Sequence, residues 1–251
     1  MKLIFSPRKK QRLPEVVSAK TYVNFTANGL KLPSKAVVCP LTPLAKTVTA
    51  QGNWKKRVLP AEVYCAEKED FCFVTGFGCG GPAVAMTTEQ LIALGVREMI
   101  FVGLAGSLQE EVQPGDIVLC SESVRADGTS PHYTGKELVK PSRLFFSKLA
   151  KRLRAEKMDF HVGRNWSTDA IYRETKAEIK HYQQNHVLTV EMETSAFYAV
   201  CARRKIAGAA VYVASDYVGG GKWQPDFKNP LIWQNLRRVL AVCENVLTHM
   251  I

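Results

Sequence analysis

Short apolar runs alternate with amphipathic segments along most of this 251-residue chain. The runs are rich in Val, Ile and Phe and do not alternate strictly with polar residues. Such runs predict strands that are buried on both faces, which is typical of a largely parallel sheet covered by helices. The predicted strands are residues 35–40, 58–66, 71–75, 98–103, 116–124, 188–192 and 209–216. The predicted helices are residues 82–94, 142–157, 174–184, 195–205 and 231–249.

The alternation of strands and helices predicts an α/β fold: a three-layer sandwich whose twisted, mostly parallel mixed sheet is flanked by helices. Residues 1–34 form a polar, basic lead-in, and residues 35–251 are expected to form a single domain. The helix over 195–205 has a detailed signature. Thr194 is the expected N-cap, and Phe197, Val200 and Cys201 recur on one face at helical spacing.

The composition is that of an ordinary globular protein, with 46% hydrophobic and 23% charged residues. No apolar run approaches the length of a membrane span, and the first residues lack the apolar core of a signal peptide. The seven cysteines include no CxxC pair, so we expect reduced core thiols and a cytoplasmic protein. No metal-site spacing is present, and no membrane partner is expected.

The net charge of +11 raises the question of an anionic partner. The basic residues are scattered in clusters such as "PRKK", "NWKKR", "KLAKRLR" and "ARRK", without a basic stripe interleaved with aromatics. This distribution favours a solvated basic surface. Binding to nucleic acid is kept as a minor alternative.

Glycines and acids gather where four of the predicted strands end. The strand over 71–75 leads into Gly76–Gly81, the strand over 98–103 leads into "GLAG", and the last two strands end at Glu193 and Asp216. In open α/β sheets, ligands bind outside the carboxyl ends of the strands. The sequence therefore predicts a ligand site at this edge of the sheet.

The glycines at 76, 78 and 81 also match the G-x-G-x-x-G pattern of dinucleotide-binding folds. That fingerprint needs a carboxylate at the end of the next strand to bind the ribose. The next strand ends at Phe101, Val102 and Gly103, so we reject this interpretation. A tight turn with a close helix approach explains the glycines.

Several segments of the sequence resemble segments that occur in the same order in the nucleoside phosphorylase and nucleosidase superfamily. The resemblance is closest to its uridine-phosphorylase-like members. The segments span about residues 36 to 226 and read "GCGGPAVAMTTEQLIALGVREMIFVGLAGSLQEEVQPGDIVL", "VRADGTSPHY", "STDAIYRET", "LTVEMETSAF" and "VASDYVGGGKW". Members of this superfamily break the bond between a nucleobase and ribose. The resemblance implies the same fold and chemistry for this chain.

By resemblance, Glu193 is the carboxylate that binds the two ribose hydroxyls, and Met192 packs against the sugar. Glu191 is expected to bind a structural partner or the edge of a ligand. Asp216 is expected to protonate the leaving base, as the aspartate of this segment does in purine-acting relatives. Its presence favours a purine or a mixed substrate, while an N-cap or loop-anchoring role is the structural alternative.

The resemblance also suggests a base pocket and its walls. Ile171 falls where purine phosphorylases have a stacking phenylalanine, Tyr172 is next to it, and Arg173 could recognise a base carbonyl. A core position for Tyr172 and a surface position for Arg173 stay open. Gly103, Leu104 and Gly106 are expected to line the cavity.

The usual phosphate ligands of the family are missing from this sequence. Leu41 and Ala45 replace a glycine and an arginine, and Phe101 and Leu104 replace an arginine and a hydroxyl residue. A dianion that enters without cationic partners loses more hydration than it recovers, so we expect this site to be closed to phosphate. The glutamate that activates water in nucleosidases is also absent. Arg125 is a candidate contact for the acceptor, with His132 and Tyr133 as further candidates.

The first hypothesis is therefore an enzyme that cleaves the N-glycosidic bond of a purine or uridine-type ribonucleoside. Hydrolysis would replace phosphorolysis, no cofactor is expected, and phosphate is a co-substrate only if other residues bind it. The alternative is a non-catalytic protein that binds or stores nucleosides on the same scaffold. The family predicts a homo-oligomer, from dimer to hexamer, with contacts from residues 1–34 or from "PHYTG".

Overall fold

Two groups of parallel strands form the sheet of this protein. The computed structural model describes residues 7–27, 29–50, 53–59, 61–66 and 70–248. The first group runs in the order β4 (Cys72–Thr75), β1 (Lys35–Val38), β5 (Glu98–Ser107) and β10 (Ala207–Tyr217). The second runs in the order β6 (Ile117–Ala126), β8 (His161–Thr168) and β9 (Val187–Glu191).

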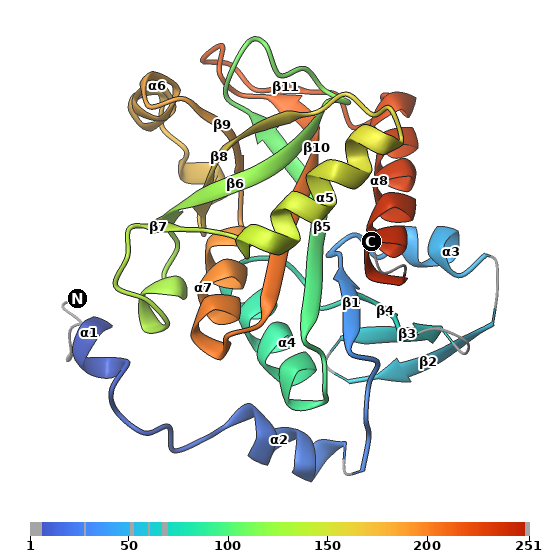
Figure 1. The fold of residues 1–251 in the computed structure, drawn as a ribbon. Coiled ribbons are helices and arrows are strands. Elements are labelled where there is room, and N and C mark those ends of the chain that lie inside the picture. Colours follow the sequence, from blue (N-terminus) through green and yellow to red (C-terminus); the bar gives the residue numbers. More distant parts are fainter. Residues whose placement is uncertain (1–6, 28, 51–52, 60, 67–69, 249–251) are drawn as a thin grey trace.

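The two groups meet in antiparallel pairs on both sides, so these strands close into a ring. β10 pairs with β6, and β5 pairs with β9 (Figure 1). Gly106 of β5 lies at the point of closure, with Val190 of β9 opposite it on one side and Asp216 of β10 on the other. The ring brings the carboxyl ends of β5, β9 and β10 to one place.

Short strands extend the sheet at its edges. β3 (Glu62–Ala66) pairs antiparallel with β4, and β2 (Trp54–Val58) pairs with β3 at the edge. β7 (Leu138–Val139) pairs with β6, and β11 (Gln224–Pro225) pairs with β10.

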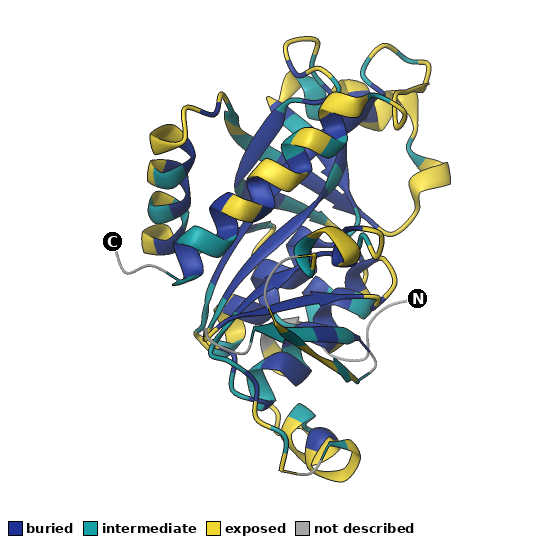
Figure 2. Ribbon diagram, turned by 90° about the vertical axis from the view of Figure 1, so that its right-hand side faces the viewer, coloured by how far each residue is buried: buried dark blue, intermediate teal, exposed yellow. Residues whose placement is uncertain are grey.

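Helices cover both faces of the sheet, which confirms the predicted mixed α/β fold. α4 (Gly81–Ala93) and α7 (Thr194–Arg204) share one apolar core with the sheet. α5 (Arg143–Ala155), α8 (Pro230–Thr248) and the short α3 (Leu44–Val48) share another with its opposite face. Figure 2 shows the buried strands between helices whose outer faces are exposed. α6 (Lys176–Gln184) packs on β9 beyond these layers, and within the described residues no helix is long and apolar enough to cross a membrane.

Three sequence-based expectations about elements need correction. The single strand over 58–66 is wrong, because β2 and β3 are separate antiparallel strands, and the lysines and arginine of β2 gave it no apolar run. β8 was not predicted, because buried polar residues such as Asn165 interrupt its sequence. Thr194 is the first residue of α7 and not its N-cap, a position that Glu193 occupies without a side-chain cap.

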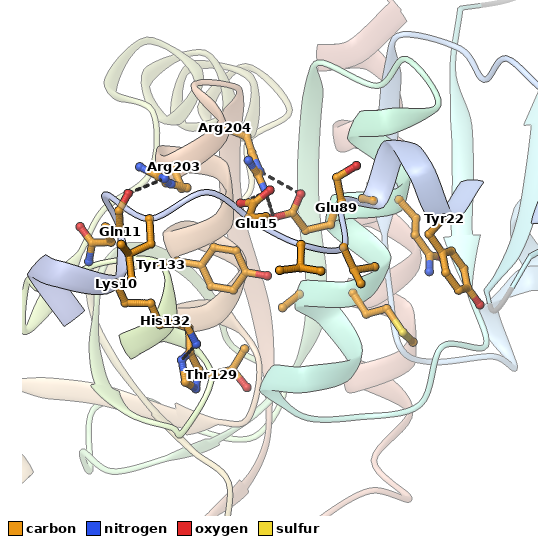
Figure 3. A pocket seen from close by; sticks show the side chains of 18 of the residues that line it. Lys10, Gln11, Glu15, Tyr22, Glu89, Thr129, His132, Tyr133, Arg203 and Arg204 are labelled. Atoms are coloured by element: carbon orange, nitrogen blue, oxygen red, sulfur yellow. Dashed lines mark hydrogen bonds and ion pairs between the residues drawn. The ribbon is translucent and has the colours of Figure 1, made fainter. Parts of the chain in front are cut away.

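The lead-in contributes two helices, α1 (Pro7–Lys10) and α2 (Ala19–Thr26), which lie along the outside of the domain (Figure 1). Residues 1–6 and 28 of the expected 1–34 segment lie outside the described residues. Between the two helices, the segment is tied to α7 by side chains. Arg203 donates to the carbonyl of Gln11 over 2.7 Å, and Arg204 lies between Glu15 and Glu89 of α4, with contacts of 2.7 and 2.8 Å (Figure 3).

A cavity of about 1020 Å³ lies between this segment and the domain (Figure 3). Apolar side chains of the lead-in and of α4, including Val16, Val17 and Met86, form much of its lining. His132, the last residue of the 3₁₀ turn η1 (Ser130–His132), and Tyr133, which follows it, also line the cavity, and His132 contacts Lys10.

We expect replacement of Arg204 by alanine to lower the free energy of unfolding by roughly 1–3 kcal/mol, because Glu89 would lose its cation in a mostly buried setting. Arg203→Ala is the matched control, since it removes only a bond to a carbonyl at the surface. It should stay within about 0.5 kcal/mol of the parent. Chemical denaturation measures both, and equal losses would contradict the role assigned to the Glu15–Arg204–Glu89 contact.

Candidate active site

The turn from β9 into α7 is organised by the buried carboxylate of Glu191. One of its oxygens accepts hydrogen bonds from Asn165 Nδ2 at 2.7 Å and Ser167 Oγ at 2.5 Å. The other accepts from the backbone N–H groups of Glu193 and Thr194, both at 2.8 Å, and from the Thr194 hydroxyl at 3.0 Å. Glu191 therefore has the structural role that was left open, as the acceptor for the first N–H groups of α7.

This arrangement places the next carboxylate, Glu193, in a different environment. Glu193 is buried, and its side chain accepts a hydrogen bond from the backbone N–H of Gly80 at the start of α4. Burial, followed by the charge of Glu191, raises the pKa of Glu193 to about 8. Burial also raises the pKa of Glu191, although the hydrogen bonds of the turn oppose that effect. Glu193 is thus a buried acid with acceptor capacity to spare for a ligand.

The loop after β6 closes over the start of α4 beside Glu193. Asp127 accepts hydrogen bonds from Ser195 and from the backbone N–H of Thr129 at 2.8 Å. Gly81 allows the close approach, because a Cβ there would lie 3.1 Å from Thr129 Oγ1 and 3.2 Å from Asp127 Oδ1. This packing fixes the Gly80 N–H that contacts Glu193.

Asp216 ends β10 on the other side of Gly106. It is buried and accepts hydrogen bonds from Ser215 Oγ at 2.5 Å and Trp223 Nε1 at 2.8 Å. A Cβ on Gly106 would lie 3.1 Å from Asp216 Oδ2 and 3.3 Å from Val190 Cγ1, so a larger residue would make tight contacts with side chains of both neighbouring strands. Asp216 and the end of β9 are therefore held on either side of one glycine.

The segment predicted to bind the base lies at the surface of the protein. Ile171, Tyr172 and Arg173 form the 3₁₀ turn η2 (Ile171–Arg173), and the side chains of Ile171 and Tyr172 are 51% and 96% exposed. Within the described residues, no interaction ties them to Asp216 or Glu193. Their role in binding a base stays a prediction.

The four positions where the resemblance leads us to expect phosphate ligands belong to apolar packing. Ala45 is buried in the core beneath α8, and Leu41 and Leu104 pack against the same core. Phe101 points to the opposite face, where its ring lies 5.8 Å from that of Phe197 and directly over Gly103. Within the described residues these positions carry no cation.

Arg125 lies in line with Ser167 and Glu191 across neighbouring strands. Its guanidinium donates to the carbonyl of Thr134 at 2.6 Å, while its Nε is buried without a partner in the described part of the chain. Burial lowers its pKa. His132 and Tyr133 lie in the lead-in cavity, which none of the other predicted site residues lines.

The described residues include no group of three or more His, Cys, Asp or Glu side chains placed to hold a metal ion.

A comparison with known protein families shows to which family the chain belongs. Its sequence matches the family described as "Phosphorylase superfamily" over residues 40–251. This chain belongs to the phosphorylase superfamily. The resemblance inferred from the motifs around Glu193 and Asp216 is thereby confirmed.

Relatives of this superfamily member include nucleoside phosphorylases of different specificity. A guanosine phosphorylase of Halorubrum lacusprofundi is 28% identical over 179 residues, which is 69% of this chain and 73% of that protein. A uridine phosphorylase of Haemophilus influenzae is 28% identical over 146 residues, 51% of this chain and 57% of that protein. The matched region thus spans less than two thirds of that uridine phosphorylase.

Solved structures show the same fold. A uridine phosphorylase of Vibrio fischeri superposes with a TM-score of 0.77 at 18% identity, covering 87% of this chain and 94% of that one. An AMP nucleosidase of Bacteroides thetaiotaomicron gives a TM-score of 0.74 at 18% identity, covering 92% and 98%. At such identities the likeness establishes the phosphorylase-superfamily fold and leaves the substrate open.

Several residues of this site were missed in the sequence. Asn165 and Ser167 belong to a strand without an apolar run, and Trp223 reaches Asp216 from a glycine-rich loop. Glu174, between η2 and α6, is a further half-buried carboxyl near Asp216. The pattern around Glu174 is that of a helix start, and only the fold brings it to Asp216.

We expect Glu191→Ala and Glu193→Ala to differ sharply in stability. Glu191→Ala leaves buried donors of β8 and α7 without an acceptor and should lower the free energy of unfolding by about 3–5 kcal/mol. Glu193→Ala removes a buried acid that accepts from one N–H in the turn at Gly80, so the fold should remain intact. Thermal and urea denaturation test the pair, and a larger loss for Glu193→Ala would contradict the assignment.

Proposed function

We propose that this chain cleaves the N-glycosidic bond of a ribonucleoside, of purine or uridine type. Glu193 would bind the ribose, and Asp216 would act on the leaving base. The observation that carries the proposal is the arrangement around Gly106, which has the strand leading to Glu193 on one side and Asp216 on the other. A nucleoside has a diol at one end and a base at the other, and this arrangement offers a carboxyl group for each.

The ribose end follows from the unusual setting of Glu193. The 2′- and 3′-hydroxyls of a ribose can each donate a hydrogen bond to one carboxylate. Burial disfavours the charged form of Glu193, and hydrogen bonds from the two hydroxyls would stabilise it. A bound ribonucleoside would therefore supply the hydrogen bonds that water provides to an exposed carboxylate. Met192, which is partly buried beside Glu193, would pack against the sugar.

The base end follows from the chemistry of bond cleavage. As the glycosidic bond breaks, positive charge develops on the sugar and negative charge on the base. A carboxylic acid near the base can protonate it, and a carboxylate near the sugar stabilises the cation. We assign the protonation of the base to the region of Asp216. This assignment favours a purine or a mixed substrate. Ile171, Tyr172 and Arg173 would cover the base from the rim.

The acceptor is proposed to be water. Leu41, Ala45 and Leu104 pack against one apolar core, and such side chains offer no positive charge to a phosphate dianion. Arg125 is the candidate for a substitute cation, and its buried Nε without a described partner supports that assignment. No cofactor enters this proposal.

A homo-oligomer is proposed as well, with the exposed apolar residues of the lead-in, such as Phe25, as its contacts.

The test is a panel of guanosine, adenosine, inosine and uridine, assayed with and without inorganic phosphate by chromatography of base and sugar products. We expect a base to be released with free ribose in phosphate-free buffer, and phosphate to accelerate the reaction little. Asp216→Asn should slow base release by about 10²- to 10⁴-fold. The exposed Asp159→Asn is the matched control and should leave the rate unchanged.

Two outcomes would change the account. Phosphate-dependent formation of ribose 1-phosphate would overturn water as the acceptor and direct attention to Arg125. Tight nucleoside binding without release of any base would overturn the enzyme and favour the nucleoside-binding or storage protein.

A further inference from the structure

Glu174 is a carboxyl group for which the fold itself offers no hydrogen-bond partner. It is half-buried between η2 and α6, where Thr175 caps α6 and forms a reciprocal capping box with Glu178. The capping box fixes the backbone next to Glu174, and the Glu174 side chain takes no part in it. Within the described residues, no hydrogen bond or ion pair reaches its carboxyl group. A half-buried carboxyl without such a partner is costly unless a ligand or a proton satisfies it.

The loop after β10 approaches the same place from the other side. A Cβ on Gly221 would lie 4.0 Å from Lys176 Cε, at the start of α6. Farther along α6, Gln183 donates to the carbonyl of Gly219 at 3.2 Å. Trp223 of this loop donates to Asp216 Oδ2. The start of α6 and the loop over 217–223 therefore meet around Asp216, which is the nearest charged group to Glu174 from β10.

The two carboxyl groups are not equivalent. Both oxygens of Asp216 accept hydrogen bonds, Oδ1 from Ser215 and Oδ2 from Trp223. Because both of its oxygens already accept a hydrogen bond, Asp216 is suited to act as an acceptor and not as a proton donor. Glu174 has both oxygens available and is the group of the pair that can present an O–H to a ligand.

We propose that Glu174 gives the proton to the leaving base, while Asp216 acts beside it as the carboxylate that keeps Glu174 protonated. This inference rests on the proposed nucleoside cleavage and moves the proton donation at the base end from Asp216 itself to Glu174 beside it. The site would then contain an acid pair at the base end, separate from the ribose carboxylate Glu193. Glu174 is a catalytic residue in this account, and Asp216 is a positioning residue for its proton.

The proton transfer is balanced. The bond between C1′ and the base nitrogen breaks, and its electron pair goes to the base. The Glu174 O–H gives its proton to a ring nitrogen of the base and becomes a carboxylate. An oxygen of water bonds to C1′, and the proton that this water loses restores the acid. Nucleoside and water become free base and ribose, and no oxidant or reductant is involved.

The electrostatics of the cluster agree with this role. Burial, then the charge of Asp216, then that of Glu178 raise the pKa of Glu174 to about 7. The charged groups that act on Glu174 are Asp216 from β10 and Glu178 from α6, while Arg173 of η2 and Lys176 of α6 are its neighbours along the chain. An acid of this pKa is largely protonated below pH 7 and can still give up its proton near neutrality.

The first experiment measures kcat/KM against pH for wild type, Glu174→Gln and the exposed control Glu156→Gln, on the nucleoside that wild type cleaves best. The glutamine keeps the shape but has no acidic proton. We expect a loss of about 10²- to 10³-fold near pH 6.5, with nucleoside affinity unchanged. The wild-type rate should fall as pH rises past about 7, because the acid ionises, and Glu174→Gln should lose that limb. The control should match wild type.

The second experiment needs no activity. Carbon-13 NMR of protein labelled at the glutamate carboxyls would follow the titration of Glu174, identified by its absence in Glu174→Gln. In Asp216→Asn the pKa of Glu174 should drop, because a neighbouring negative charge is gone. An unchanged titration in Asp216→Asn would overturn the pairing.

The outcomes separate this inference from the proposed function. If wild type releases base and Glu174→Gln does so equally fast with the same pH profile, the role of Glu174 is wrong and nucleoside cleavage stands. If wild type releases no base from any nucleoside, the proposed function fails and proton delivery fails with it.

Discussion

The hydrogen bonds of the Glu191 carboxylate are the interaction on which the site depends. Its oxygens join β8, through Asn165 and Ser167, to the first turn of α7, through Thr194 and the N–H of Glu193. Without such an acceptor, α7 would begin with unpaired N–H groups deep in the protein. The same bonds fix the backbone of Glu193, so a structural carboxylate determines where the carboxyl group proposed to bind the ribose lies. This explains why two glutamates stand so close together despite the cost of burying both.

The ring of strands supplies the second constraint. Because β5 pairs with β9 on one side and β10 on the other, Gly106 has the strand to Glu193 and Asp216 as neighbours. A Cβ at Gly106 would lie in tight contact with Asp216 and Val190, so the glycine leaves room for both side chains. Leu41, Ala45 and Leu104, where the sequence resemblance predicts contacts to phosphate, instead add to the apolar core. In the proposed function, the acidic groups would serve the two ends of a nucleoside, and the apolar positions would leave water as the acceptor.

Much of the layered α/β fold could be predicted, because its central strands and long helices are marked by apolar periodicity. β8 could not be, since its buried Asn165 and Ser167 are polar and their partner is a carboxylate distant in sequence. Glu193 and Asp216 were accessible through motifs that end strands. Glu174 was not, because its sequence context indicates only the start of a helix, and its proximity to Asp216 exists only in the folded chain.

The central claim, that Glu191 positions Glu193 to bind a ribose diol, is tested most directly by calorimetric titration. A ribonucleoside and its 2′,3′-dideoxy analogue would be titrated into wild type and into Glu193→Ala. Two hydrogen bonds to a buried carboxylate predict that wild type prefers the ribonucleoside by about 100-fold or more, a preference that Glu193→Ala should lose. Equal affinity of wild type for both ligands, or an undiminished preference in Glu193→Ala, would contradict the account.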